Sequence, residues 1–217
     1  MKTLTLNSIL SRVGKELKAR NLLRERMLAE ARRVLKLSKE SVILIHRGRL
    51  EAAEKKLMKA GKLLSQTLKM LEEAPELRYG GAMASACQEY AEALTLLKLE
   101  KEQRFPTPEE AGVDFQSYLL GLADVPGELR RLILDALMKG DVEEAQRKFH
   151  LMEEIYSSLI TLDEHVFSLV SGLRRKCDII RHLLELTGSD LVVERRQQRL
   201  EKALKTIERH ASRLKGE

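Results

Sequence analysis

Four acidic residues stand out because their spacing suits a metal site. Glu89 and Glu92 lie three residues apart in the stretch SACQEYAEAL, and Asp124 and Glu128 lie four apart in YLLGLADVPGELRRL. Both stretches carry the apolar stripe of a helix, and residues three or four apart share a helix face. Neighbouring carboxylates repel one another and are costly to bury unpaired, so a shared cation would relieve both problems. Oxygen-only ligands favour a hard divalent ion, which predicts a Mg²⁺ or Mn²⁺ site.

The same acids allow other interpretations. An ExxE pair on a helix usually marks a solvated face, and Glu128 can serve as a first-turn acid that faces the helix dipole. A carboxylate-bridged di-iron centre also uses inward-facing Glu residues, but neither acidic helix offers its usual Glu-x-x-His motif, which counts against iron. The five His residues are scattered, and no HExxH or CxxC motif competes as a catalytic constellation.

Composition and length favour one all-helical domain over residues 1–217. The chain is 43% hydrophobic, 33% charged and only 4% aromatic, as expected of a helical globular protein. No apolar run approaches the length of a membrane span, and the N-terminus lacks the apolar core of a signal peptide. Cys87 and Cys177 are interpreted as buried thiols in a reducing compartment, which places the protein in the cytoplasm.

The charge is distributed unevenly along the chain. Residues 1–70 carry a net charge of +12, residues 71–128 a net charge of −8, and the whole chain +6. A basic first third beside an acidic middle suggests a polyanion-binding surface next to a cation-binding one. The alternative is that the two regions neutralise each other across a helix interface.

Hydrophobic periodicity predicts about seven helices in a helical bundle. The expected helices cover 4–45 with a candidate break near Asn21, 50–71, 83–100, 114–139, 141–186 with a candidate break, and 191–214. The first of them is expected to be capped by Thr5 or Asn7 and to end at Gly48. A turn is expected at 78–81, an irregular stretch at 101–115 with a short turn capped by Thr107, and a helix end at TGSD (187–190). Pro126 predicts either a kinked helix or a new segment capped by Asp124.

With these elements placed, the sequence resembles the translin family, and within it the translin-associated factor X branch. The resemblance rests on four segments in matching order: RRVLKLSKESVILIHRGRLEAA (32–53), QEYAEAL (88–94), FQSYLLGLADVPGELRR (115–131) and VSGLRRKCDIIRHLLELTGSDL (170–191). The pattern YLLGLAD-x-x-GEL within the third segment is the most specific.

The resemblance implies a seven-helix protomer that assembles into a ring or closed shell, usually an octamer, and binds single-stranded RNA or DNA. In the factor X branch the assembly is a metal-dependent endoribonuclease with its carboxylates facing the interior. Glu89, Glu92, Asp124 and Glu128 match the acidic positions of that branch, which implies that they are both the metal ligands and the catalytic residues. Of these, Glu89 and Asp124 are the strongest candidates for direct ligands.

Nucleic-acid contact is expected on the basic N-terminal helix. Arg32, Lys39, His46 and Arg47 lie in the first family-like segment, and the first three share a helix face because they are seven residues apart. Such side chains contact backbone phosphates without reading sequence. The absence of Trp argues against stacking platforms for bases. For each residue alone, a solvated helix face is the alternative.

The sequence therefore predicts a Mg²⁺- or Mn²⁺-dependent endoribonuclease that acts on RNA inside a homo-oligomeric shell. The main alternative is a non-catalytic oligomer of translin type that binds single-stranded RNA or DNA. A third class is a structural bundle that engages protein partners and has no affinity for nucleic acid.

Overall fold

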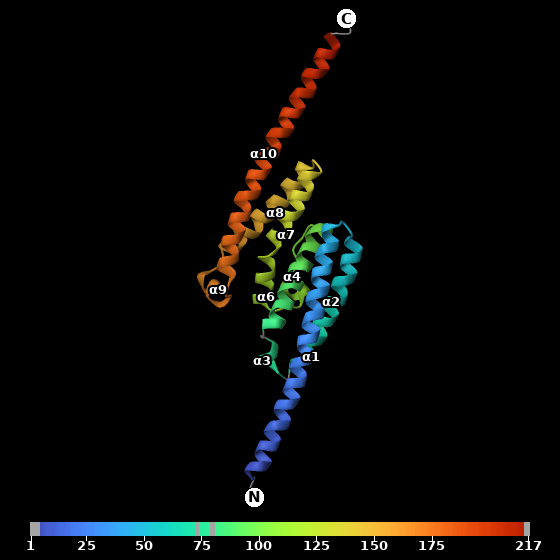
Figure 1. Cartoon of the computed structure of the whole chain (residues 1–217). Helices are drawn as coiled ribbons and strands as arrows, with labels where there is room; N and C mark the ends of the chain where they lie inside the picture. Colours follow the sequence, from blue (N-terminus) through green and yellow to red (C-terminus); the bar gives the residue numbers. More distant parts are fainter. Residues whose placement is uncertain (1–4, 73, 79–80, 215–217) are drawn as a thin grey trace. The chain divides into compact units, whose positions relative to one another are not determined.

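The computed structural model describes residues 5–72, 74–78 and 81–214, and over these residues it contains helices and no strand (Figure 1). The predicted all-helical class is confirmed. The described residues form ten helices, of which seven have eight residues or more. The chain divides into two compact units, Met1–Gly121 and Leu122–Glu217. The single domain expected over 1–217 stays a prediction.

The first unit is built on three long helices that pack on one another. It contains α1 (Leu6–His46), α2 (Leu50–Met70), α3 (Pro75–Arg78), α4 (Gly81–Glu102), α5 (Pro108–Ala111) and α6 (Phe115–Leu122), whose last residue crosses the boundary. Helix α1 packs against both α2 and α4, and α2 also packs against α4. Their shared core includes Val34, Leu64, Met83 and Leu96, all almost completely buried. Burial of each such side chain stabilises the fold by about 1.5–3 kcal/mol.

Helix α1 begins and ends at the predicted signals. The Thr5 hydroxyl accepts a hydrogen bond from the Ser8 amide, and the helix stops before Gly48, which has φ +68°. A positive φ costs glycine little, so Gly48 ends the helix without strain. The break predicted near Asn21 is wrong, since α1 is continuous. Asn costs only a fraction of a kcal/mol in a helix interior (less than ~0.7), too little to break a helix of this length.

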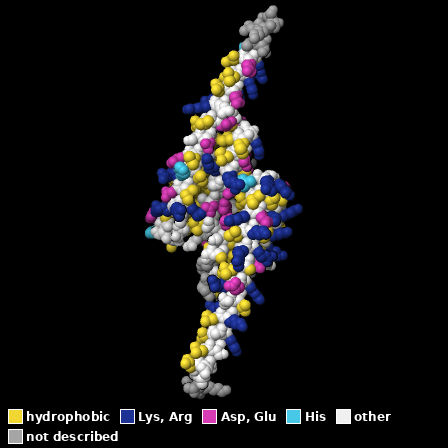
Figure 2. All heavy atoms as spheres, in the orientation of Figure 1, with side chains coloured by type: hydrophobic (Ala, Val, Ile, Leu, Met, Phe, Trp, Pro, Cys, Tyr) yellow, Lys and Arg dark blue, Asp and Glu magenta, His cyan; other side chains and the backbone are white. Residues whose placement is uncertain are grey.

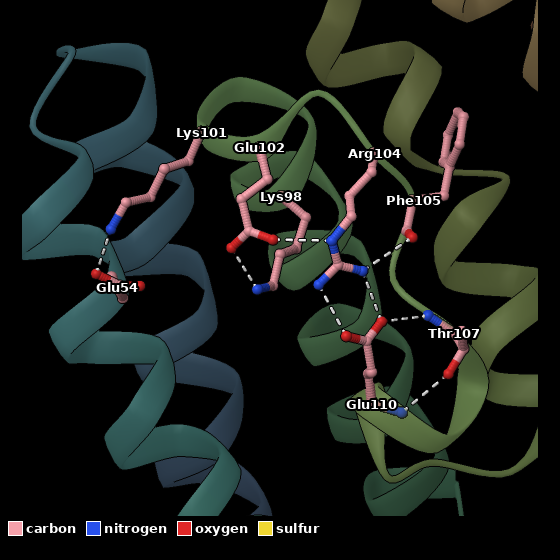
Figure 3. Close-up of polar contacts among 8 residues, drawn as sticks. All are labelled: Glu54, Lys98, Lys101, Glu102, Arg104, Phe105, Thr107 and Glu110. Carbon is pink, nitrogen blue, oxygen red and sulfur yellow. Dashed lines mark hydrogen bonds and ion pairs between the residues drawn. The ribbon is translucent and has the colours of Figure 1, made fainter.

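An ion-pair network fixes the segment between α4 and α5 (Figure 3). Arg104 donates to both oxygens of Glu110 at 2.8 Å and also pairs with Glu102. Glu110 accepts from the Thr107 amide at 2.8 Å, while the Thr107 hydroxyl accepts from the Glu110 amide at 3.2 Å. This reciprocal capping box confirms Thr107 as the cap of a short helical turn. The network therefore anchors the chain where α4 ends.

The same network predicts acid sensitivity. Hydrogen bonds from Arg104 and then from the Thr107 amide lower the pKa of Glu110 to about 2. A carboxyl group with a lowered pKa stabilises the fold above its unfolded value of 4.5, and this stabilisation is lost as the pH falls from there towards about 2. We expect Glu110→Gln to lower the melting temperature at neutral pH and to melt nearer to the wild type at about pH 3.

Glu109→Gln is the matched control, because Glu109 is an adjacent exposed acid of the same short helix. Thermal unfolding followed by circular dichroism measures both variants. An equal loss in the two variants at neutral pH would show that the network contributes nothing specific.

The second unit contains α7 (Val125–Met138), α8 (Val142–Ile160), α9 (Glu164–Leu169) and α10 (Leu173–Leu214). Helix α7 packs against α8, and α10 packs against both. Of the two arrangements predicted around Pro126, the structure has two helices, because α6 ends at Leu122 and α7 begins at Val125. The break predicted within 141–186 is present between α8 and α10, where the short α9 intervenes.

The helix end predicted at TGSD is wrong, because α10 runs through it without interruption. The hydroxyls of Thr187 and Ser189 donate to carbonyls one turn earlier, Leu183 at 2.6 Å and Glu185 at 3.1 Å. Arg130 of α7 donates to the Thr187 hydroxyl at 2.6 Å and pairs with Asp190 at 3.0 Å. These contacts between helices override the local preference of such residues for caps and turns.

Two remaining predictions concern turns and membranes. The turn expected at 78–81 falls mostly on residues 79–80, which lie outside the described residues. None of the described helices is both long enough and apolar enough to span a membrane.

Candidate metal centre and nucleic-acid surface

Helix α4 presents Glu89 and Glu92, one turn apart and both half-buried. The Lys39 ammonium of α1 lies 3.6 Å from a carboxylate oxygen of Glu89. A predicted metal ligand and a predicted RNA contact are therefore neighbours in the first unit. In a partly buried setting this lysine offsets part of the cost of the acidic pair.

Two close approaches hold α4 in position. Gly121 of α6 lies so close to α4 that an added Cβ would stand 2.6 Å from the Gln88 carbonyl oxygen and 3.0 Å from the Glu92 amide nitrogen. On the α2 side, a Cβ at Gly61 would stand 2.4 Å from the hydroxyl oxygen of Tyr90. Tyr90 is buried, which raises the pKa of its hydroxyl. The helix turn that carries the acids is thus clamped from two sides.

The Gly121 contact predicts a large effect from a small substitution. A methyl group in Gly121→Ala must push against backbone atoms, which cannot rotate away, so we expect a loss of about 1–3 kcal/mol in the free energy of unfolding. Chemical denaturation measures the loss.

Gly14→Ala is the control, because Gly14 lies inside α1 with nothing within 4 Å of an added Cβ. There the same change should stabilise the helix by up to about 1 kcal/mol. If Gly121→Ala were as stable as the wild type, the close contact between α6 and α4 would be refuted.

The second unit carries the other two acids at the start of α7. Asp124 occupies the N-cap position, but its side chain makes no cap hydrogen bond. Its carboxylate instead accepts from the Lys176 ammonium of α10. The prediction that Asp124 caps α7 is therefore correct in position but not in bonding. Glu128 lies in the first turn and pairs with Arg131 at 3.1 Å.

The four predicted ligands offer carboxylate oxygens, which hard divalent ions prefer. All four acids are half-buried, and two belong to each unit. Glu89 forms an ion pair with Lys39, and Asp124 forms one with Lys176. Each lysine offsets part of the cost of partly burying the carboxylate. Within the ranges that the structure describes, no group of three or more His, Cys, Asp or Glu side chains forms a metal-binding cluster. The assignment of these acids as ligands thus stays a prediction.

The predicted RNA contacts follow α1 to its end. Arg32, Lys39 and Arg47 are exposed, whereas His46 is half-buried as the last residue of the helix. The Arg32 guanidinium donates to the Leu28 carbonyl at 3.1 Å, so it lies along the helix surface. Three of the four residues are therefore accessible to a phosphate backbone.

Sequence reasoning missed Lys176 as the partner of Asp124. Lys176 lies in the basic run RRK of the fourth family-like segment, and only that run pointed towards it. Its pairing links residues 52 positions apart, a distance over which no local pattern gives information. The role of Gly121 was missed for the same reason.

The chain belongs to the translin family, because the model of that family matches residues 22–187. Over 144 residues it is 37% identical to an uncharacterised protein of Methanocaldococcus jannaschii. That match covers 65% of this chain and 62% of the relative, so it spans less than two thirds of the relative's length.

Solved structures of similar fold carry the name C3PO. AfC3PO is 35% identical with a TM-score of 0.76, and the match covers 86% of this chain and 96% of AfC3PO. A complex of AfC3PO with duplex RNA matches at 34% identity, with the same TM-score and the same coverage. Apo-NeC3PO is 27% identical with a TM-score of 0.77, and the match covers 88% of this chain and 99% of NeC3PO. The translin-like protomer fold predicted from the sequence is confirmed.

Proposed function

We propose that this protein is a Mg²⁺- or Mn²⁺-dependent endoribonuclease of the translin-associated factor X type. It cleaves RNA inside a homo-oligomeric shell, with an octamer as the expected size. The observation that carries the proposal is that α4 and the start of α7 each present two half-buried acids one turn apart, Glu89 with Glu92 and Asp124 with Glu128. Carboxylate oxygens grouped in this way suit a hard divalent ion.

Hydrolysis of a phosphodiester requires a water nucleophile and relief of the charge that builds on the phosphate oxygens. A divalent ion supplies both when it is bound, as a Lewis acid that also lowers the pKa of water. Glu89 and Asp124 would be its direct ligands, while Glu92 and Glu128 would bind directly or orient the water. Lys39 is exposed beside Glu89, where it can contact a backbone phosphate of the substrate.

The comparisons support RNA as the substrate. A relative of similar fold, AfC3PO, is named in complex with duplex RNA, and we extend RNA binding to this chain by that likeness.

Cys87 and Cys177 form no disulfide and are buried, which supports a reducing compartment such as the cytoplasm. The alternative is a translin-type oligomer that binds RNA or single-stranded DNA without cleaving it.

Cleavage of labelled RNA with Mg²⁺, with Mn²⁺ and with chelator tests the proposal. We expect metal-dependent cleavage by the wild type and a rate loss of roughly 100-fold or more in Glu89→Gln or Asp124→Asn, because each removes a charged ligand. RNA binding, measured by fluorescence anisotropy, should persist in both variants.

Matched controls come from the same helices. The control variants are Glu100→Gln and Asp135→Asn. Glu100 lies on α4 and Asp135 on α7, and neither residue belongs to the proposed site. Both control variants should cleave like the wild type. Binding without cleavage under every metal would instead assign the protein to the translin-type alternative.

Exposed apolar side chains support the oligomeric shell. Helix α1 has no buried residue before Met27, yet its first turns carry apolar residues at the four-three-four spacing of a coiled-coil seam: Leu6, Leu10, Val13 and Leu17. Beyond Leu191, α10 carries Val193, Leu200, Leu204 and Ile207, all exposed, at steps of seven, four and three. Figure 2 shows hydrophobic side chains among the charged ones along this part of the chain. Exposed stripes with this spacing are typical of helix–helix interfaces.

The oligomer makes a prediction of its own. Size-exclusion chromatography with light scattering should give a multiple of the 24.8 kDa chain mass. Leu10→Gln with Leu17→Gln should shift the mass to smaller species, because it replaces two of the four apolar residues of the α1 stripe. Lys15→Gln with Lys18→Gln, on the same stretch of helix but outside the stripe, should not. A wild type of 24.8 kDa at every concentration would rule out the shell.

A further inference from the structure

The second unit carries a basic groove that none of the assignments above uses. It lies between α8 and α10, which pack against each other (Figure 1). Its volume is about 540 Å³. Helix α8 contributes Glu143, Arg147 and His150 to its lining, and α10 contributes Arg195, Arg199 and Lys202.

The cations of α10 point to an anionic ligand. Arg195, Arg199 and Lys202 follow one another at steps of four and three, so they share one helix face. All three side chains are exposed. Within the described part of the chain, none of them forms an ion pair with a carboxylate. Glu143 is the one acid in the groove lining that the structure describes. Like charges this close on a helix destabilise it unless a counter-charge arrives.

The basic residues of α8 behave differently. Arg147 pairs with Glu144, and His150 lies 2.9 Å from a carboxylate oxygen of Glu153. Gln198 of α10 donates to the Gly140 carbonyl at 3.1 Å, which holds α10 against the start of α8. On the α8 wall Arg147 is therefore paired with an acid of its own helix, while the α10 wall carries three positive charges and the lining offers Glu143 as an acid.

We propose that this groove binds the phosphate backbone of RNA, an inference that rests on the RNA-binding function proposed above. The three cations extend along α10 over roughly 10 Å, which suits consecutive phosphates better than one. A single phosphate or mononucleotide would need donors that converge on a point. Guanidinium groups bind phosphates with paired hydrogen bonds, and two of the three cations are arginines.

The composition of the lining argues against a protein ligand. A protein interface needs an apolar or aromatic centre, and the lining holds no aromatic residue other than the His150 ring, with Val142 as its apolar member. Because the groove has no side chain on which a base could stack, we expect it to contact the phosphates and not the bases. It therefore extends the RNA contacts beyond α1 without adding sequence specificity.

The test measures RNA affinity against salt concentration, with chelator present so that cleavage plays no part. The probes are a labelled oligouridylate and an RNA duplex of equal length. We expect Arg199→Gln to weaken binding severalfold and to reduce the slope of log K against log salt by about 0.7–0.9, the value of one phosphate contact. Arg195→Gln with Arg199→Gln should reduce the slope by about twice as much.

Arg196→Gln is the matched control, because Arg196 is an exposed arginine of the same helix that does not line the groove. It should leave both affinity and slope close to the wild type. Glu143→Gln should tighten binding severalfold, a gain that damage to the fold could not produce. Circular dichroism verifies that each variant is folded.

The outcomes separate this inference from the proposed function. If the wild type binds RNA and Arg199→Gln behaves like Arg196→Gln, the groove is not an RNA site, and the cleavage proposal is unaffected. If the wild type binds neither probe at low salt, both proposals fail. If only the duplex responds to Arg199→Gln, the groove holds the backbone of double-stranded RNA.

Discussion

The arrangement of the first unit depends on how closely α4 approaches its neighbours. Gly121 lets α6 come against the α4 backbone between Gln88 and Glu92, and Gly61 makes room for the Tyr90 hydroxyl on the other side. Packed interiors do not deform continuously, so a helix held in this way has little freedom to rotate or slide. The orientation of Glu89 and Glu92 therefore depends on the absence of a side chain at Gly61 and at Gly121, and not on the acids themselves.

Electrostatics acts within this frame. The sequence left two interpretations open, in which the basic first third either binds a polyanion or neutralises the acidic middle. The structure shows neutralisation at Lys39 with Glu89, a pair that joins the two regions. Other cations of α1 and α2 pair with acids of the same two helices, as Arg33 does with Glu30 and Lys56 with Glu40. The two interpretations are thus compatible, because Lys39 balances a half-buried acid while other cations, such as Arg32 and Arg47, are exposed where a polyanion could reach them.

The features predicted correctly are local ones. Thr5, Gly48, Thr107 and Pro126 each act through bonds or steric clashes within a few residues, so the sequence suffices to place the helix ends beside them. TGSD carries equally strong local signals, and the prediction made there was wrong because Arg130 binds Thr187 and Asp190 from another helix. The acids were found because spacing on one helix is a local property. Lys176 and Gly121, which position them, act through contacts distant in sequence and could not be found in that way.

The scarcity of aromatic residues limits what kind of RNA protein this chain can be. Only 4% of residues are aromatic and none is Trp, and no Phe or Tyr lines the groove of α8 and α10. Recognition would then rest on phosphates, which are the same in every sequence. The proposed nuclease would then select RNA by its shape, length or ends rather than by base stacking. An enclosed site reached only through an oligomeric shell would provide such selection, because it admits RNA by size and not by sequence.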